Sequence, residues 1–214
     1  SDIKAHREII DESATEARKK EAEEKVDKQY SLRTDVQKQS EEKIKGFFSS
    51  VEKVLAQDKP EEEKAKLIPR APFKITDAQA NKFASMNEQS TKKLESVCID
   101  GLNKAYEAPI EDGNEQDLKE AKKEYTDFIS SSDLSDSEKD IALNFVNVVE
   151  PNFFYDKEKT DELIKETLKQ VPPVMIKKNQ IVVSEGEPVT AHQLELLGTL
   201  GLLSDSASAL YIYI

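Results

Sequence analysis

The stretch of residues 36–55 constrains the fold most strongly, because its apolar side chains recur at the spacing of an α-helix. These apolar positions are Val36, Ile44, Phe47, Phe48, Val51, Val54 and Leu55. Residues three or four positions apart lie on one side of a helix. The stretch therefore predicts a helix that begins near Asp35 and buries one face in a core.

Most of the remaining chain is polar, with 35% charged residues, 37% hydrophobic residues and no tryptophan. This composition favours solvent-exposed helices around a small core over a compact sheet enzyme. The 43 acidic residues outnumber the 31 basic ones, which gives a formal net charge of −12. Because nucleic-acid affinity depends on basic residues that neutralise phosphates, the charge argues against a nucleic-acid partner.

The single cysteine, Cys98, lies between Val97 and Ile99. One cysteine excludes an intramolecular disulfide and a cysteine-rich zinc site. Its apolar neighbours predict a buried thiol rather than a nucleophile.

Several helix starts can be read from capping boxes, in which Ser or Thr is followed three positions later by Glu or Gln. The four candidates begin at Ser13, Thr76, Ser135 and Thr190. With the apolar spacing, they predict helices over 13–28, 35–55, 76–106, 115–129, 135–149 and 157–170, a short helix after Pro60 and a last helix from Thr190. The prolines between 68 and 72 predict a connector.

The C-terminal part has a different character, with short β-branched segments at 171–176 and 181–183 around a turn. These segments are the best strand candidates in the chain. Residues 178–182 also resemble residues 185–189, which aligns Asn179 with Gly186. Because Asn and Gly best tolerate a positive φ, we expect two equivalent turns with that conformation. An anion-binding backbone nest is the alternative, which Glu185 and Glu187 disfavour.

A longer repeat aligns residues 11–26 with residues 156–171 without a gap. Each copy has an apolar pair before an Asp, then a Thr, a charged helix and a Val. Chance similarity between two Lys- and Glu-rich helices is the alternative explanation. If the repeat is real, the two ends of the chain form equivalent halves, with the central helices inserted between them.

The sequence thus predicts a mainly α fold, with a helical body and a small α/β lobe that contains a short two- or three-stranded sheet. We expect residues 1–32 and 151–203 to form the lobe as two repeat-like halves, and residues 33–150 to form the inserted body. Residues 204–214 end in an apolar segment with two tyrosines. This end is typical of a run-in to a transmembrane helix or of a C-terminal edge strand.

The chain carries no recognisable catalytic set. Its two histidines, His6 and His192, are not in a clustered ligand spacing, and no glycine-rich phosphate loop is present. We therefore expect no catalytic residue, metal site or cofactor. His192 is expected to be an exposed residue in the first turn of the last helix. Three polar residues beside the repeat segments, Tyr30, Asn152 and Tyr155, are the candidates to line a cleft or to join the two halves.

Several motifs of this chain together resemble the extracellular domain of the bacterial seven-transmembrane HD hydrolases, of the PgpH type. The motifs are Ile3-Lys-Ala-His-Arg7, residues 11–15, Val26, Tyr30, Phe47-Phe48, Glu150-Pro-Asn152, Val171-Pro-Pro-Val174, Glu185-Gly-Glu-Pro-Val-Thr190 and Leu197-Gly-Thr-Leu-Gly-Leu-Leu203. The chain departs from the family at Asn179, where a Gly is usual, and residues 57–135 carry little signature.

The resemblance implies an outer domain of a membrane protein whose separate cytoplasmic HD domain hydrolyses cyclic di-AMP with a bound metal pair. On this basis we expect a non-catalytic extracytoplasmic domain that senses an extracellular ligand or protein and acts through its parent's own transmembrane helices. Composition alone would favour a different protein, a free-standing helical interaction or chaperone-like protein.

Overall fold

The computed structural model describes residues 1–203 and divides the chain into two compact units. Unit 1 consists of Ser1–Gln29 and the described part of Lys157–Ile214, and unit 2 consists of Tyr30–Asp156. The boundaries differ by a few residues from those expected at 32/33 and 150/151. The reason is that residues 30–32 and 153–155 pair with each other as strands and belong to the helical unit.

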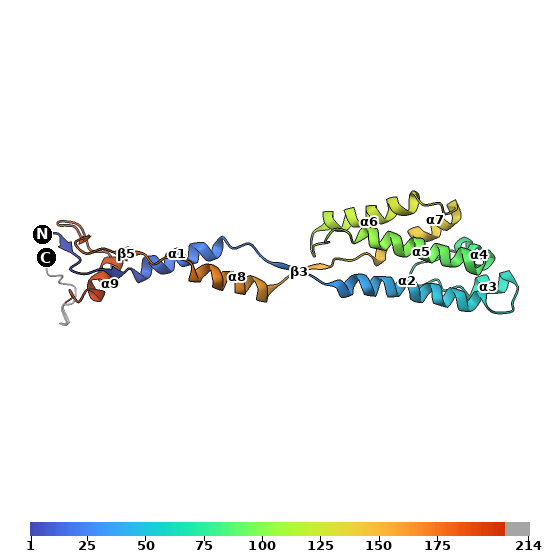
Figure 1. The fold of residues 1–214 in the computed structure, drawn as a ribbon, viewed down its shortest axis with the longest axis horizontal. Helices are drawn as coiled ribbons and strands as arrows, with labels where there is room; N and C mark the ends of the chain where they lie inside the picture. Colours follow the sequence, from blue (N-terminus) through green and yellow to red (C-terminus); the bar gives the residue numbers. More distant parts are fainter. Residues whose placement is uncertain (204–214) are drawn as a thin grey trace. The chain divides into compact units, whose positions relative to one another are not determined.

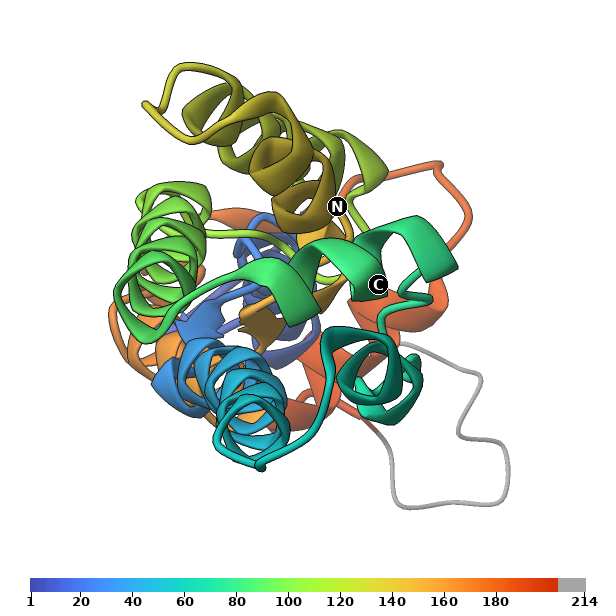
Figure 2. The same ribbon diagram turned by 90° about the vertical axis from the view of Figure 1, so that its right-hand side faces the viewer.

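Unit 2 is built from helices whose apolar faces meet in one core (Figure 1). They are α2 (Thr34–Leu55), α3 (Glu61–Leu67), α4 (Asp77–Ser85), α5 (Glu88–Ala105), α6 (Glu115–Ser130), α7 (Asp136–Leu143) and the 3₁₀ helix η1 (Val146–Val148). Helix α5 packs against both α2 and α6, and Figure 2 shows α2 and α5 nearly end-on.

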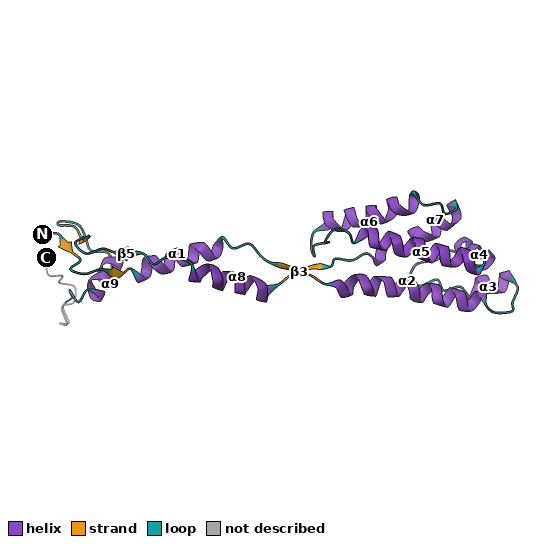
Figure 3. Cartoon of the chain, in the orientation of Figure 1, coloured by secondary structure: helices purple, strands orange, loops and turns teal. Residues whose placement is uncertain are grey.

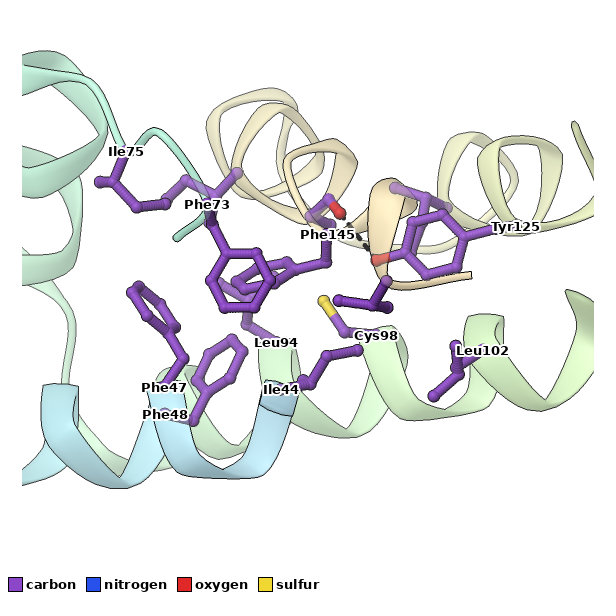
Figure 4. Close-up of a cluster of buried hydrophobic side chains, with 14 of the residues drawn as sticks. Ile44, Phe47, Phe48, Phe73, Ile75, Leu94, Cys98, Leu102, Tyr125 and Phe145 are labelled. Carbon is purple, nitrogen blue, oxygen red and sulfur yellow. Dashed lines mark hydrogen bonds between the residues drawn. The ribbon is translucent and has the colours of Figure 1, made fainter. Parts of the chain in front are cut away.

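The apolar stripe predicted for residues 36–55 is the buried face of α2. On this face, the Phe47 ring contacts the rings of Phe48, Phe73 and Phe145, with centroid distances of 5.3–5.7 Å (Figure 4). Offset and edge-to-face contacts of this kind add to the free energy gained by burial. Phe145 and Phe48 are fully buried.

Three of the predicted helices begin, continue or end differently in the structure. The predicted helix 135–149 ends at Leu143, and residues 146–148 form the 3₁₀ helix η1 instead, because the Val149 N–H bonds to the Val146 carbonyl three residues back. The predicted helix 76–106 is interrupted at Met86, because Asn87 caps a new helix by accepting a hydrogen bond from the Ser90 N–H. The first helix, α1 (Glu12–Glu24), is capped by Asp11 instead of Ser13. The capping boxes at Thr76, Ser135 and Thr190 are confirmed.

Unit 1 combines short strands with three helices (Figure 3). Its strands are β1 (Ile3–Lys4), β2 (Ile9–Ile10), β5 (Met175–Ile176) and β6 (Ile181–Val183), and its helices are α1, α8 (Lys157–Lys169) and α9 (Ala191–Thr199). Strand β1 pairs with β6 and β2 pairs with β5, both antiparallel. A small apolar cluster joins these strands to α9.

The two predicted C-terminal strands exist as β5 and β6, but each pairs with a strand from the N-terminal end of the chain. The two turns that follow them are confirmed as equivalent, because Asn179 has φ 71° and Gly186 has φ 81°. The positive φ explains why Asn can replace Gly at the first turn.

Contacts in the structure recur at the offset of the long sequence repeat. Helix α1 begins at Glu12 and ends at Glu24, and α8 begins 145 residues later at Lys157 and ends at Lys169. The only buried residue of each helix is a threonine, Thr15 in α1 and Thr160 in α8. The Thr15 hydroxyl accepts a hydrogen bond from the Val174 N–H, and the Thr160 hydroxyl accepts one from the Gln29 N–H, both at 2.9 Å.

The strand pairs follow the same relation. Ile10 lies opposite Met175 in the β2–β5 pair. The repeat aligns Ile10 with Tyr155 and Tyr30 with Met175, and Tyr155 and Tyr30 also lie opposite each other, in β4 (Phe153–Tyr155) and β3 (Tyr30–Leu32). Two lysine- and glutamate-rich helices that align by chance would not share strand register and buried threonines. These contacts support the repeat as a structural relation.

The fold class is as expected, mainly α with short two-stranded antiparallel sheets. Among the residues that the structure describes, no helix has the length and apolar character needed to cross a membrane. The predicted transmembrane run-in at 204–214 lies outside the described residues.

Candidate functional site

The three residues singled out from the sequence come together at the β3–β4 strand pair of unit 2. Tyr30 lies directly opposite Tyr155, and Asn152 immediately precedes β4. The strands form here because aromatic and apolar residues follow the helix-breaking Pro151 on one side and precede the cap of α2 on the other.

Asn152 is a buried connector, with 4% of its surface exposed. Its side-chain Oδ1 accepts a hydrogen bond from the Ile110 N–H at 2.8 Å, and its own N–H donates to the Ile110 carbonyl at 3.0 Å. Its carbonyl accepts from the Arg33 N–H at 2.7 Å. Because the loop before α6 and the start of α2 both bond to this residue, which immediately precedes β4, Asn152 holds three segments of unit 2 together.

Tyr30 lies in an aromatic cluster on one face of the strand pair. Its ring stacks on Phe153 with a centroid distance of 5.5 Å, and the edge of Tyr155 approaches at 6.2 Å. A hydrogen bond to the Glu111 carboxylate, together with the negative charge of Glu111, raises the pKa of the Tyr30 hydroxyl above its usual 10.0. The hydroxyl therefore stays protonated and acts as a donor at neutral pH.

The same face remains partly open to solvent. Leu32 is 52% exposed and Tyr155 is 48% exposed, and both alternate with residues that point to the opposite face. On that opposite face, the Ser31 hydroxyl donates to the Asp156 carboxylate at 2.6 Å, and the Arg33 guanidinium lies 5.2 Å from the centre of the Phe154 ring. In the described part of the chain, Tyr30, Asn152 and Tyr155 are not among the lining residues of four cavities of unit 2. Their role in a cleft stays a prediction.

One polar pair of unit 1 was not foreseen from the sequence. The Nε2 atom of His192 lies 2.8 Å from both carboxylate oxygens of Asp11, which also caps α1 through the Ala14 N–H. Asp11 is 3% exposed, whereas the side chain of His192 is 47% exposed. These residues are 181 positions apart, so no local pattern could have revealed the pair.

The Cys98 thiol is buried in the core of unit 2. Burial raises the pKa of the Cys98 thiol to about 12, so this side chain stays protonated at neutral pH and is a poor nucleophile. In residues 1–203, no group of three His, Cys, Asp or Glu side chains could hold a metal ion.

Three cavities of unit 2 differ in the charges that surround them. One of about 260 Å³ between α5 and α6 is lined by Glu107, Asp117, Glu120 and Glu124, with Lys104. Another, of about 390 Å³, is lined by Glu52 and Glu88 beside apolar residues. A third, of about 230 Å³, is lined by Lys43 and Lys74 with two asparagines and no carboxylate.

Comparison with known proteins gives one family and one curated relative. The model of the family described as "7TM-HD extracellular" matches residues 1–204. The chain is 32% identical over 125 residues to the "Cyclic-di-AMP phosphodiesterase PgpH" of Listeria monocytogenes serotype 1/2a (strain 10403S), an alignment that covers 55% of this chain and 17% of that protein. The chain thus spans about a sixth of the length of this relative. No solved structure matches.

Proposed function

Because the chain belongs to the 7TM-HD extracellular family, we propose that it is the sensor domain of a membrane-anchored HD phosphodiesterase, on the extracytoplasmic side. The observation that carries the proposal is the family match over residues 1–204, which includes all the described residues. It supports this function over that of a free-standing interaction or chaperone-like protein.

We further propose that the parent protein hydrolyses cyclic di-AMP with a metal-dependent HD domain that is separate from this chain. The support is the 32% identity to the phosphodiesterase of Listeria monocytogenes.

The arrangement of unit 1 supports a route for a signal. The first strand, β1, pairs with β6, and the Arg7 guanidinium donates to the Thr199 carbonyl at 2.8 Å. Both ends of the described chain are therefore held in one unit. A ligand acts on such a domain only if it binds two arrangements with different affinity, since equal affinity shifts no equilibrium.

The test is cyclic di-AMP hydrolysis by the purified full-length parent in lipid nanodiscs. We expect Phe145→Ala, which removes a fully buried ring of unit 2, to change the rate, and Leu67→Ala, at a residue that is 44% exposed, to leave it unchanged. The far-ultraviolet circular dichroism of each purified chain reports whether unit 2 is perturbed. Identical rates for wild type and both variants, with unit 2 unfolded in Phe145→Ala, would contradict the sensor role.

A further inference from the structure

The cavity of about 230 Å³ in unit 2 differs from its neighbours in charge. Its lining includes Lys43 from α2, Lys74 from the loop before α4, and Asn144 and Asn147 near η1, over a floor of Phe73 and Val148. We propose that this cavity binds a small anionic ligand, one that carries a carboxylate or a phosphate group. The inference rests on the proposed sensor function and names the chemical class of the ligand.

The charge of the lining is the first argument. The chain has a net charge of −12, and three other cavities of unit 2 are each lined by two to four carboxylates, including one where Glu62 and Asp77 lie beside Lys66 and Arg70. This cavity has two lysines and no carboxylate, and neither lysine forms an ion pair with another described residue. A concave surface lined by one sign of charge focuses the electric field and attracts ions of the opposite sign.

The backbone at Lys74 is the second argument. Lys74 has φ 54°, in the left-handed region that Gly or Asn adopts at lower cost. A non-glycine residue in this region is strained and persists where the surrounding structure imposes it. Lys74 thus lines the cavity from a backbone conformation that the surrounding structure imposes.

The surroundings that impose this conformation are a buried network of amides. The Asn144 side-chain N–H donates to the Phe73 carbonyl at 3.1 Å and to Gln79 Oε1 at 2.8 Å. Gln79, which is 5% exposed, also caps α4 with Thr76. Phe73 and Ile75 on either side of Lys74 are buried. The loop is therefore held in place before any ligand arrives, which reduces the entropy lost on binding.

Size and donors define the ligand further. The cavity is smaller than the roughly 300–1,000 Å³ typical of sites for drug-sized molecules, so it suits a small molecule or a single charged group of a larger one. The Asn147 Oδ1 atom accepts a hydrogen bond from the Lys122 ammonium at 3.3 Å. The two ammonium groups and the side-chain N–H groups of Asn147 are donors, and carboxylate and phosphate oxygens accept from both; the side-chain N–H groups of Asn144 already donate to Phe73 and Gln79.

The test is isothermal titration calorimetry of the purified chain at constant ionic strength. Citrate and inorganic phosphate are titrated in separate experiments. We expect saturable binding of at least one of the two, and the comparison between them distinguishes a carboxylate ligand from a phosphate ligand. The double variant Lys43→Gln/Lys74→Gln should weaken this binding at least about tenfold, which corresponds to ~1.4 kcal/mol.

The matched control is Lys38→Gln/Lys119→Gln, which removes the same charge from two exposed lysines outside the cavity. It should leave the affinity within about twofold, since distant exposed charges are screened by salt. Equal weakening in both double variants, or no saturable binding of either anion, would overturn the proposal. The melting temperatures of both variants verify that they remain folded.

The full-length parent separates failure of this site from failure of the sensor role. If the anion binds but cyclic di-AMP hydrolysis does not respond to it, the site stands and the sensor role is contradicted. If hydrolysis responds to the anion equally in wild type and in Lys43→Gln/Lys74→Gln, the sensor role stands and the cavity is the wrong site.

Discussion

Unit 2 buries a cluster of phenylalanine rings between its helices, whereas the apolar cluster of unit 1 contains no aromatic side chain. The paired helices α1 and α8 of unit 1 bury one residue each, and both of these residues are threonines that bond to backbone N–H groups. Unit 2 thus depends on apolar burial, and this helix pair depends on specific hydrogen bonds. The difference teaches that a charged helix with few apolar residues can still be placed by a single buried hydroxyl.

The largest test of the comparison is Phe145→Ala in unit 2. Phe145 is fully buried and its ring lies 4.6 Å from that of Phe73. We expect the free energy of unfolding of unit 2 to fall by about 3–5 kcal/mol, because the substitution removes apolar contacts and leaves a cavity. Urea unfolding followed by circular dichroism measures it, with Leu67→Ala as the exposed control. A loss below about 1 kcal/mol would show that unit 2 does not depend on this cluster.

The second test asks whether the helices of unit 2 are closely packed. A Cβ added at Gly101 of α5 would lie 3.1 Å from ring atoms of Tyr125. This ring cannot move freely, because its hydroxyl donates to the Ala142 carbonyl at 2.7 Å (Figure 4). We expect Gly101→Ala to lower the free energy of unfolding by about 1–3 kcal/mol.

The same substitution at Gly46 of α2 is the matched control. Nothing lies within 4 Å of a Cβ built there. Because Ala is favoured over Gly in a helix interior, we expect Gly46→Ala to raise the free energy of unfolding by about 0.5–1 kcal/mol. Chemical denaturation of both variants should therefore give changes of opposite sign, and equal signs would contradict the packing described for α5 and α6.

In unit 1, Thr15→Val and Thr160→Val test the hydrogen-bonded helix pair. Each substitution keeps the side-chain shape but leaves a backbone N–H, of Val174 or of Gln29, without its acceptor. We expect losses of about 1–2 kcal/mol at both sites, since an unsatisfied donor in a partly buried position keeps much of its desolvation cost. Hydrogen exchange of α1 and α8 measures the effect.

The control for these two variants is Thr126→Val in α6, whose hydroxyl bonds only within its own helix, to the Lys122 carbonyl. It should change stability by less than about 0.5 kcal/mol. A clear loss at Thr15 with none at Thr160 would show that the two copies of the repeat are not equivalent in energy.

The smallest effect is expected for Tyr30→Phe, and it depends on pH. The Glu111 hydrogen bond raises the pKa of Tyr30 in the folded chain, so its stabilisation is present below pH 10.0 and is lost as the pH rises through the higher folded pKa. At pH 8 we expect the variant to melt less than about 2 °C below wild type. The difference should disappear above the folded pKa, and a difference that grows with pH would contradict the assigned bond.

Much of the helical architecture could be predicted from the sequence, because capping and apolar periodicity are local. The stripe of α2 and the capping boxes at Thr76, Ser135 and Thr190 illustrate this. The short strands β1 to β4 were not predicted, since two or three residues are too few to show alternation. The sequence did identify Tyr30, Asn152 and Tyr155 as neighbours of the repeat. It could not show their partners, because Ile110 lies 42 residues before Asn152 and Glu111 lies more than 40 residues after Tyr30.

The sequence by itself therefore determined most of the helices, the capping boxes at Thr76, Ser135 and Thr190, the two turns with positive φ and the family. Only the tertiary structure decided which strands pair, that Asp11 meets His192 and that Lys43 and Lys74 line one cavity. The physical reason is the separation along the chain over which each interaction acts. Capping and periodicity act between residues less than one or two helical turns apart, whereas strand pairing, buried polar pairs and cavities bring together residues whose separation in the chain carries no pattern.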